Sequence, residues 1–369
     1  MRTVTAALMA ATLLPGGALQ KQVGRIAYHR RRPVVAQRAF AGALRTRPDR
    51  ETWLYAASTE ERLKRPDRRD ADVAIANERF PAPDYDARAA FAVSTARPWE
   101  RDAVARFAAE HADRLAAAAL ELRESARDTG RGRFAFVYWN SLDRPDVVQH
   151  CIASMRAHLP ADLTLVELHD GNLADWVDID RRILDLVDIP AHRADLIRLH
   201  LLSTWGGMWL DASCLLNPDF PAFAGTIRDE DLFLFTYRGS RTGNWFIWGT
   251  PESYRLQLLR STLDAWFLDG RRWTNYFMFH DVVEMLYWTD PRYRAEWDAG
   301  MHLRPDRAFD CHKTLGRSVT DEEWRAVRRR SPINKLSWRK YNAPELRADP
   351  TSGIARLMAE PLPAGLVSA

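Results

Sequence analysis

Cysteine is scarce in this chain, and the short motifs that mark several large enzyme classes are missing. The 369 residues include three cysteines, Cys151, Cys214 and Cys311, and no two of them form a CxxC pair. This spacing indicates neither a disulfide framework nor a zinc site, and it favours a reducing compartment. The sequence has no P-loop, GxSxG or HExxH motif, and no GxGxxG motif after a strand. P-loop kinases, lipases, zinc proteases and dehydrogenases therefore have no motif support.

Long apolar runs are also missing. The one candidate, Val4–Leu14, has only Arg2 as a basic residue before it, and it is short for a membrane span of roughly 20 residues. The run is compatible with a cleaved signal peptide, an N-terminal helix or a misassigned start. The sequence alone leaves these three alternatives open.

Positive charge is concentrated near the N-terminus. The segment Lys21–Asp70 holds 14 Lys and Arg against 6 Asp and Glu, a balance of +8, whereas the whole chain carries +4. Such a surface suits a solvated helix face, an anionic membrane surface or an acidic partner. We therefore expect a cytoplasmic protein, either free or peripheral at the inner face of the membrane, with no nucleic-acid partner.

The composition divides the chain into three regions. Residues 1–130 are rich in Arg and Ala and are expected to be mainly helical or irregular, with one strong helix over Trp99–Arg127. Residues 131–345 alternate apolar strands with helices and are expected to form an α/β domain. Residues 346–369 are expected to form a loose C-terminal tail.

Strands and helices alternate through the second region. The expected strands are Phe134–Trp139, Leu163–Leu168, Met208–Leu216, Asp231–Tyr237 and Trp245–Trp248. The expected helices are Pro145–Leu159, Pro190–Thr204, Glu252–Leu268 and Tyr276–Trp288. This alternation predicts an α/β fold in which helices cover both faces of a sheet.

A polar stripe marks the helix expected over Pro190–Thr204. His192, Asp195 and Arg198 follow one another at steps of three, so they lie on one face of an otherwise apolar helix. Charged side chains on a mostly buried helix are rare unless they are paired or functional. The stripe therefore fits either a structural ion pair between Asp195 and Arg198 or a ligand site.

A carboxylate follows this helix at a favourable position. Gly206 and Gly207 end the helix and permit the turn into the strand expected over Met208–Leu216, which carries Asp211. Open α/β sheets bind ligands beyond the carboxyl ends of their strands. Asp211 is therefore well placed to hold a hard divalent cation, Mg²⁺ or Mn²⁺, beside substrate phosphates.

Two consecutive motifs make this segment specific. Ala-x-Arg-Ala-Asp-Leu-x-Arg-x-x-Leu-Leu begins at Ala191, and Trp-Gly-Gly-Met-Trp-Leu-Asp-Ala-Ser ends at Ser213. Together they resemble the capsular polysaccharide synthesis branch of the glycosyltransferases that carry a DXD sugar-binding motif. Similar blocks stand in order at Phe136–Asn140, Pro145–Ser154, Asn244–Ile247, Tyr276–His280 and Asn334–Trp338. The resemblance implies the GT-A fold, a Rossmann-like and mostly parallel sheet flanked by helices, with a nucleotide-sugar site.

The resemblance also implies roles for individual residues. Asp195 would hold sugar hydroxyls, Arg198 would lie near the donor sugar or its phosphates, and Asp211 would be the first acid of the DXD motif. Ser213 stands where a second Asp is expected, so dependence on Mn²⁺ or Mg²⁺ is left open. We expect Asp195 and Asp211 in catalysis, and Asp211, Ser213 and His280 as metal ligands.

The donor-binding residues are expected at strand ends and turns. The set is Tyr138, Trp139, Asn140, Arg198, Gly206, Gly207 and Lys335. Its first three members end the first expected strand, where a nucleotide base would lie in this fold. Its last member supplies a point charge for the pyrophosphate.

These features predict a glycosyltransferase that moves a sugar from a nucleotide-sugar donor to a saccharide or lipid-linked acceptor in capsular or cell-surface polysaccharide assembly. Two alternatives stay open. The missing second acid is compatible with a protein that binds nucleotide-sugar or glycan without turnover. Asp211 is also compatible with a phospho-sugar transferase or hydrolase.

Overall fold

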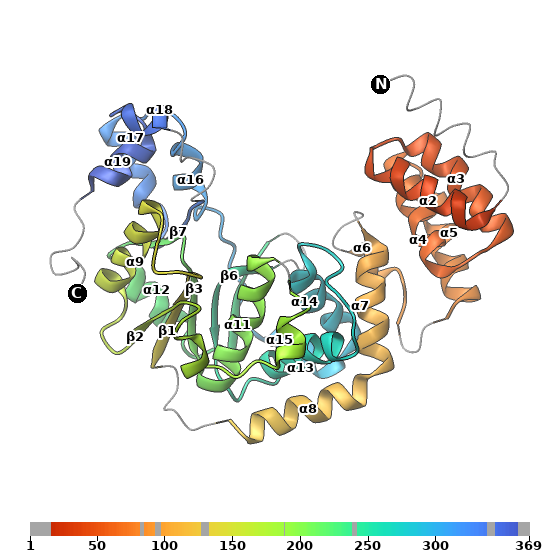
Figure 1. Cartoon of the computed structure of the whole chain (residues 1–369), viewed down its shortest axis with the longest axis horizontal. Helices are drawn as coiled ribbons and strands as arrows, with labels where there is room; N and C mark the ends of the chain where they lie inside the picture. Colours follow the sequence, from red (N-terminus) through yellow and green to blue (C-terminus); the bar gives the residue numbers. More distant parts are fainter. Residues whose placement is uncertain are drawn as a thin grey trace. The chain divides into compact units, whose positions relative to one another are not determined.

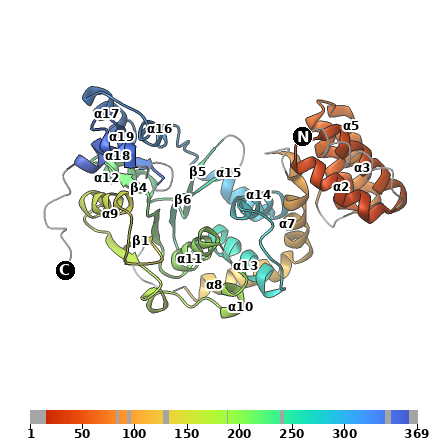
Figure 2. The ribbon, with the colours of Figure 1, turned by 45° about the horizontal axis from the view of Figure 1, so that its top comes forward.

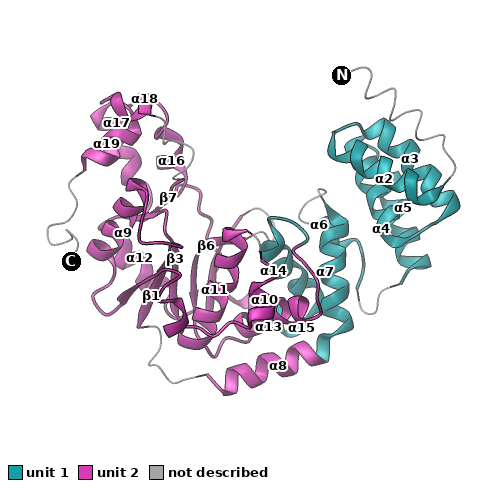
Figure 3. Ribbon diagram, in the orientation of Figure 1, with its two compact units in different colours: residues 1–113, 238–240, 274–294 teal, residues 114–237, 241–273, 295–369 magenta. Residues whose placement is uncertain are grey.

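The computed structural model describes residues 16–81, 85–92, 97–126, 133–187, 189–237, 242–337 and 344–360. These residues form two units (Figure 3). Unit 1 contains the described residues up to Asp113 together with Thr274–Arg294, and unit 2 contains the remaining described residues. The apolar run Val4–Leu14 lies outside the described residues. None of the described helices is long and apolar enough to cross a membrane.

Unit 1 is helical, as the sequence predicts. Its helices are α2 (Gly17–His29), α3 (Pro33–Thr46), α4 (Arg50–Arg62), α5 (Pro66–Arg79), α6 (Ala89–Ala92), α7 (Pro98–Glu110) and α14 (Met278–Thr289). Helices α2 to α5 pack consecutively around buried aromatic residues, among them Tyr28, Phe40, Tyr55 and Trp99. The rings of Tyr55 and Trp99 stack with their centroids 3.6 Å apart, so aromatic contacts contribute much of this core.

Unit 2 is built on a five-stranded sheet in the order β2-β1-β3-β6-β5. The strands are β1 (Phe134–Tyr138), β2 (Thr164–Leu168), β3 (Gly207–Asp211), β5 (Leu232–Thr236) and β6 (Thr242–Gly249). Strand β1 pairs in parallel with β2 and β3, whereas β6 is antiparallel to both β3 and β5. Four of these five strands therefore run in one direction, which confirms the predicted α/β fold with a mostly parallel, Rossmann-like sheet.

Helices cover both faces of this sheet. Helices α9 (Asp146–His158) and α12 (Phe220–Ile227) lie on one side, and α11 (Pro190–Trp205) and α13 (Tyr254–Leu268) lie on the other (Figures 1 and 2). The remaining helical segments are α8 (Ala112–Glu124), η1 (Leu173–Asp175), α10 (Arg181–Leu184), α15 (Pro291–Ala299), α16 (Asp310–Thr314), α17 (Asp321–Arg328), α18 (Pro344–Ala348) and α19 (Gly353–Ala359). Of these, α8 and α15 each begin in unit 1.

Side chains along β3 alternate between the two faces, as the pleat of a strand requires. Met208 and Leu210 belong to the hydrophobic core that β3 shares with α9 and α12. Trp209 faces the other side, where its ring lies 4.9 Å from the guanidinium carbon of Arg198 on α11. The same alternation directs Asp211 toward α11, so the strand brings its last carboxylate to the charged stripe of that helix.

One expected strand is two strands in the structure. The prediction of a single strand over Met208–Leu216 is wrong, because β3 ends at Asp211 and β4 (Cys214–Leu216) leaves the main sheet. Strand β4 pairs instead with β7 (Ile333–Lys335) in an antiparallel two-stranded sheet, with Cys214 opposite Lys335. The turn between β3 and β4 therefore lies where the two sheets meet.

The helix expected over Trp99–Arg127 is two helices in the structure. It is divided at His111 into α7 and α8, and the first segment of unit 1 ends at Asp113. Because α14 packs on α7, the segment Thr274–Arg294 joins the N-terminal helices in unit 1.

The described part of the C-terminal tail is ordered into helices. The tail expected to be loose from residue 346 contains part of α18 and all of α19, and within α19 Ile354 and Leu357 lie one helical turn apart and are fully buried. These two side chains share a core with Cys151 on α9 and Trp324 on α17. Residues 361–369 lie outside the described residues.

Gly207, the first residue of β3, lies close to the backbone of β1, and this close approach can be tested by substitution. It has φ 99°, and a Cβ there would overlap the carbonyl oxygen of Phe134 at the start of β1. We expect Gly207→Ala to lower the free energy of unfolding by at least about 2 kcal/mol, from backbone strain and steric overlap. Urea denaturation of the full-length chain measures this loss.

The matched control is Gly225→Ala in α12, where an added Cβ meets nothing within 4 Å. Alanine there is expected to be neutral or to stabilise the chain by about 0.5–1 kcal/mol. Equal unfolding midpoints for the two variants would contradict the role given to Gly207.

Candidate functional site

Four charged side chains of unit 2 form a connected group, the charge cluster, made of Asp195, Arg198, Asp211 and Lys335. Arg198 lies between the two carboxylates, with its Nη1 atom 3.2 Å from Oδ1 of Asp195 and its Nη2 atom 3.3 Å from Oδ1 of Asp211. The Nζ atom of Lys335 lies 2.8 Å from Oδ2 of Asp211. The charges therefore alternate in sign along the cluster, and each carboxylate has a cation beside it.

Helix α11 supplies the first two members of the cluster. Asp195 and Arg198 stand one turn apart on a helix that begins at Pro190, a residue suited to the first helical turn. Gly206 ends the helix with φ 65° and donates its backbone N–H to the carbonyl of Leu202. These end signals fix the length of α11 and hold its charged face against β3.

Asn244 on β6 completes the inner part of the cluster. Its side-chain amide nitrogen donates to Oδ1 of Asp195 at 2.7 Å, and its backbone carbonyl oxygen accepts a hydrogen bond from the guanidinium of Arg198. Asn244 is not among the site residues expected from the sequence. The available signal was its position at the start of the block Asn244–Ile247, which resembles a family motif.

The turn after β3 brings Ser213 to the outer part of the cluster. The Nζ atom of Lys335 donates to Oγ of Ser213 at 2.6 Å, in addition to its contact with Asp211. On the other side, Nε1 of Trp209 donates to Oδ1 of Asp211 at 3.0 Å. All three side-chain oxygens of Asp211 and Ser213 thus face hydrogen-bond donors.

The two carboxylates of the cluster have opposite pKa shifts. Burial raises the pKa of Asp195 to about 6, although the neighbouring Arg198 acts in the opposite direction. Burial also opposes ionisation of Asp211, but the charges of Lys335 and Arg198 outweigh it and lower the pKa of Asp211 to about 2. Burial acts to lower the pKa of Lys335, yet the charge of Asp211 raises it above its usual value. Asp211 and Lys335 are therefore both charged at neutral pH.

Exposure separates the cluster into an inner and an outer pair. The side chains of Asp195 and Arg198 are each 4% exposed, whereas those of Asp211 and Lys335 are 24% and 18% exposed. A ligand would therefore meet the outer pair first. The inner pair is placed to hold the outer pair in position.

The expected donor residues at the end of β1 lie beside this strand edge. Tyr138 is the register partner of Asp211 across β1 and β3, and its hydroxyl donates to Oδ1 of Asp170 at 2.5 Å. The backbone N–H of Asp170 donates in turn to the carbonyl of Asn140 at 3.3 Å. Trp139 packs partly buried against the core of the sheet. The structure thus brings Tyr138 to the same edge as Asp211 and ties it to Asp170.

Two other predicted site residues, Gly206 and Gly207, are not brought to the charge cluster. Gly206 and Gly207 lie at the amino end of β3, whereas Asp211 lies at its carboxyl end, and their positive φ angles and close packing account for the two glycines. His280, the third expected metal ligand, lies on α14 in unit 1. Of the expected metal ligands, unit 2 therefore supplies Asp211 and Ser213.

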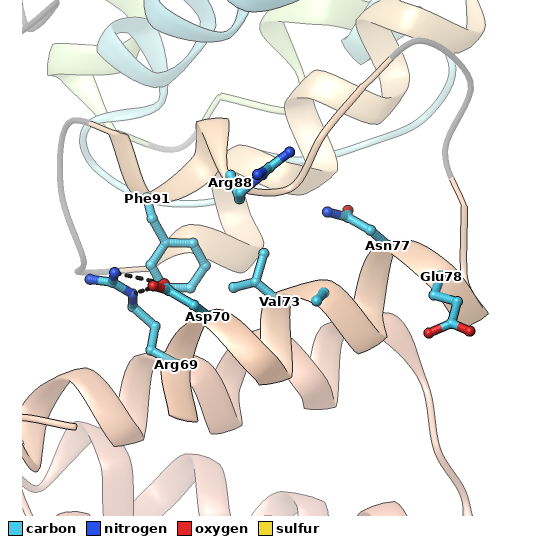
Figure 4. Close-up of a pocket in the computed structure, with 8 residues that line it drawn as sticks. Arg69, Asp70, Val73, Asn77, Glu78, Arg88 and Phe91 are labelled. Carbon is cyan, nitrogen blue, oxygen red and sulfur yellow. Dashed lines mark hydrogen bonds and ion pairs between the residues drawn. The ribbon is translucent and has the colours of Figure 1, made fainter. Parts of the chain in front are cut away.

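Unit 1 contains a hollow of about 840 Å³, whose charged side chains are arranged differently from those of the charge cluster (Figure 4). Its lining residues include Arg69, Asp70, Asn77, Arg88 and Phe91. Arg69 is hydrogen-bonded to the adjacent, exposed Asp70, as the dashed lines in Figure 4 show. Arg88 pairs with its own neighbour Asp86 at the surface. Arg69 also pairs with Glu61 on α4. The charge cluster of unit 2 instead joins side chains of α11, β3 and β7 that are at most 24% exposed.

The pKa of Asp195 generates a prediction about stability. Because the folded pKa is raised to about 6, the folded state binds more protons than the unfolded state at mildly acid pH, so this group's contribution to stability falls as pH rises through that window. Arg198→Met removes the cation between the two carboxylates. We expect a loss of about 3–5 kcal/mol at pH 8, where Asp195 would be ionised and uncompensated.

The loss is expected to be clearly smaller at pH 5, where Asp195 can bind a proton. Urea denaturation at the two pH values measures the difference. Arg182→Met is the control, because Arg182 pairs with Asp180 at the surface, where the two side chains are 75% and 35% exposed, so we expect little change in stability at either pH. Equal losses for Arg198→Met at both pH values would contradict the assignment of the raised pKa to Asp195.

Comparison with protein-family models gives a match. The family model described as capsular polysaccharide synthesis protein matches residues 121–348, a span that contains the main sheet, the small sheet and all four members of the charge cluster. No curated protein and no solved structure matches the chain. Since the match covers more than half of the 369 residues, the chain belongs to the capsular polysaccharide synthesis protein family.

Proposed function

We propose that this protein is a glycosyltransferase that moves a sugar from a nucleotide-sugar donor to a hydroxyl of a saccharide or lipid-linked acceptor. Membership of the family indicates a role in capsule biosynthesis. Polysaccharides are built by sugar transfer. The charge cluster contains cations, which suit the diphosphate of a nucleotide-sugar donor, and carboxylates, which suit the hydroxyls of its sugar. The family assignment gives the biosynthetic role, and the charge cluster supports the specific reaction proposed here.

The observation that carries the proposal is the position of the charge cluster. Asp211 ends β3 at the carboxyl edge of a mostly parallel sheet, the edge at which open α/β sheets bind nucleotides and other ligands. Two carboxylates and two cations from α11, β3 and β7 meet there, partly buried. A purely structural ion pair would need only Asp195 and Arg198, whereas Asp211 and Lys335 form a second, more exposed pair.

Each member of the cluster has a distinct role in this proposal. Lys335 donates a hydrogen bond to the diphosphate of the donor, and Asp211 orients Lys335 and the donor sugar. Asp195 and Asn244 hold the guanidinium of Arg198, which keeps Asp211 in place. Tyr138, at the neighbouring strand end, lies where a nucleotide base is expected. Asp195 is thus a positioning residue, because its side chain is only 4% exposed.

The reaction exchanges one bond at the anomeric carbon for another. The bond from that carbon to the diphosphate oxygen breaks, and its electron pair leaves with the nucleoside diphosphate. The acceptor hydroxyl oxygen bonds to the same carbon, and its proton passes to water. The sugar carries oxocarbenium character at the transition state, as in glycoside chemistry generally. Fixed charges and orientation are expected to supply much of the rate acceleration.

A panel of nucleotide sugars tests the proposal. Full-length protein is incubated with each donor and with saccharide acceptors, and nucleoside diphosphate release and glycoside formation are measured. We expect release coupled to transfer for at least one donor. Binding without release under every acceptor would favour a nucleotide-sugar or glycan-binding protein. Turnover of phosphorylated sugars in place of nucleotide sugars would favour a phospho-sugar transferase or hydrolase.

Asp211→Asn gives a sharper test of the site. The substitution removes the charge that holds Lys335 and contacts Arg198, so we expect turnover to fall by about 100-fold or more while the circular dichroism spectrum stays native. Asp219→Asn is the matched control, because Asp219 is exposed at the start of α12 and makes no capping hydrogen bond. Unchanged turnover in Asp211→Asn would remove Asp211 from the mechanism.

A further inference from the structure

The two residues of unit 2 that were expected to hold a divalent cation both contact one ammonium group. The Nζ atom of Lys335 lies 2.8 Å from Oδ2 of Asp211 and 2.6 Å from Oγ of Ser213. The second carboxylate oxygen of Asp211 accepts from Trp209 and faces Arg198. The position between Asp211 and Ser213 is therefore taken by a positive charge that belongs to the chain.

The donor set fits this ammonium better than a divalent ion. Mg²⁺ and Mn²⁺ prefer several oxygen ligands, with carboxylates prominent among them. In the parts of the chain that the structure describes, no group of three or more His, Cys, Asp and Glu side chains could hold a metal ion. An ion between Asp211 and Ser213 would displace the ammonium group and would be repelled by both Lys335 and Arg198.

The backbone fixes Lys335 at this position. Lys335 is the last residue of β7, and it lies opposite Cys214 in the pairing of β7 with β4. Its backbone N–H donates to the carbonyl of Ala308 at 2.8 Å, and the next N–H, that of Leu336, donates to the carbonyl of Ser213 at 2.9 Å. The small sheet therefore holds the base of the lysine stem against the turn that carries Ser213.

We infer that Lys335 stands in place of a divalent cation, so that the site binds the diphosphate of its nucleotide donor directly and without metal. This inference rests on the proposed glycosyltransferase function. An ammonium group has three N–H donors. Asp211 and Ser213 accept two of them, and the third donates to a phosphate oxygen. Lys335 keeps its proton throughout and balances the charge that the diphosphate gains as it leaves.

Titration of the native, full-length chain with nucleoside diphosphates tests this inference without any substitution. UDP, GDP, CDP and ADP are titrated by calorimetry in buffer with EDTA and in buffer with Mn²⁺. We expect the best ligand to bind in EDTA, with a Kd that Mn²⁺ tightens by less than about threefold. Greater tightening, or binding that requires Mn²⁺, overturns the inference and leaves the proposed function standing. Absence of binding in both buffers overturns the proposed function, and the inference falls with it.

Lys335→Ala tests the assigned residue. We expect the affinity in EDTA to fall by at least about tenfold, and Mn²⁺ to restore part of it by entering the vacated position between Asp211 and Ser213. Lys313→Ala is the matched control, because Lys313 is 66% exposed and pairs with Asp310 at the surface, and it is expected to bind as the native chain does. Native affinity of Lys335→Ala in EDTA overturns the inference. If Lys335→Ala does not fold, the comparison of native protein in EDTA and Mn²⁺ still decides it.

Discussion

The ion pair between Asp211 and Lys335 joins two strands from different sheets, and much of the arrangement at this edge of unit 2 depends on it. Asp211 ends β3 in the main sheet, and Lys335 ends β7 in the small sheet. The turn through Ser213 links the two sheets because β4 follows it directly. A partly buried carboxylate between two cations is stable only while both remain in place, since the removal of one partner leaves an uncompensated charge. The pair thus couples the packing of the C-terminal segment to the geometry of the strand edge.

Burial divides the cluster into two carboxylates with different properties. Asp195 lies deeper, and its pKa is raised to about 6. Asp211 has the closer cations, and its pKa is lowered to about 2. Pairs of acids whose environments push their pKa values apart are typical of sites that need one permanent charge and one group with a different task. Here the permanent charge belongs to the more exposed residue, which agrees with a ligand-facing outer pair and a supporting inner pair.

The local features of the fold were predictable from the sequence, and the long-range ones were not. The stripe of Asp195 and Arg198 follows from helical spacing, and the α/β class follows from the alternation of strands and helices. The break between β3 and β4 was not predicted, because the segment Met208–Leu216 is mostly apolar and resembles one strand. The two strands are separate because β4 pairs with β7, which comes much later in the chain. The contacts of Asn244 with Asp195 and of Lys335 with Ser213 bridge 49 and 122 residues. Spacing along the chain carries no information on such contacts.

The position of β7 late in the chain has a consequence for the order of events during synthesis. All five strands of the main sheet have been translated once Gly249 is added, whereas Ile333–Lys335 follows much later. At typical translation rates the interval is roughly 4 to 17 seconds. Until then the nascent chain carries the acidic half of the outer pair without its basic half. The ligand-facing part of the site is therefore assembled only after β7 has been translated, and a nascent chain that lacks β7 has the main sheet without a finished binding surface.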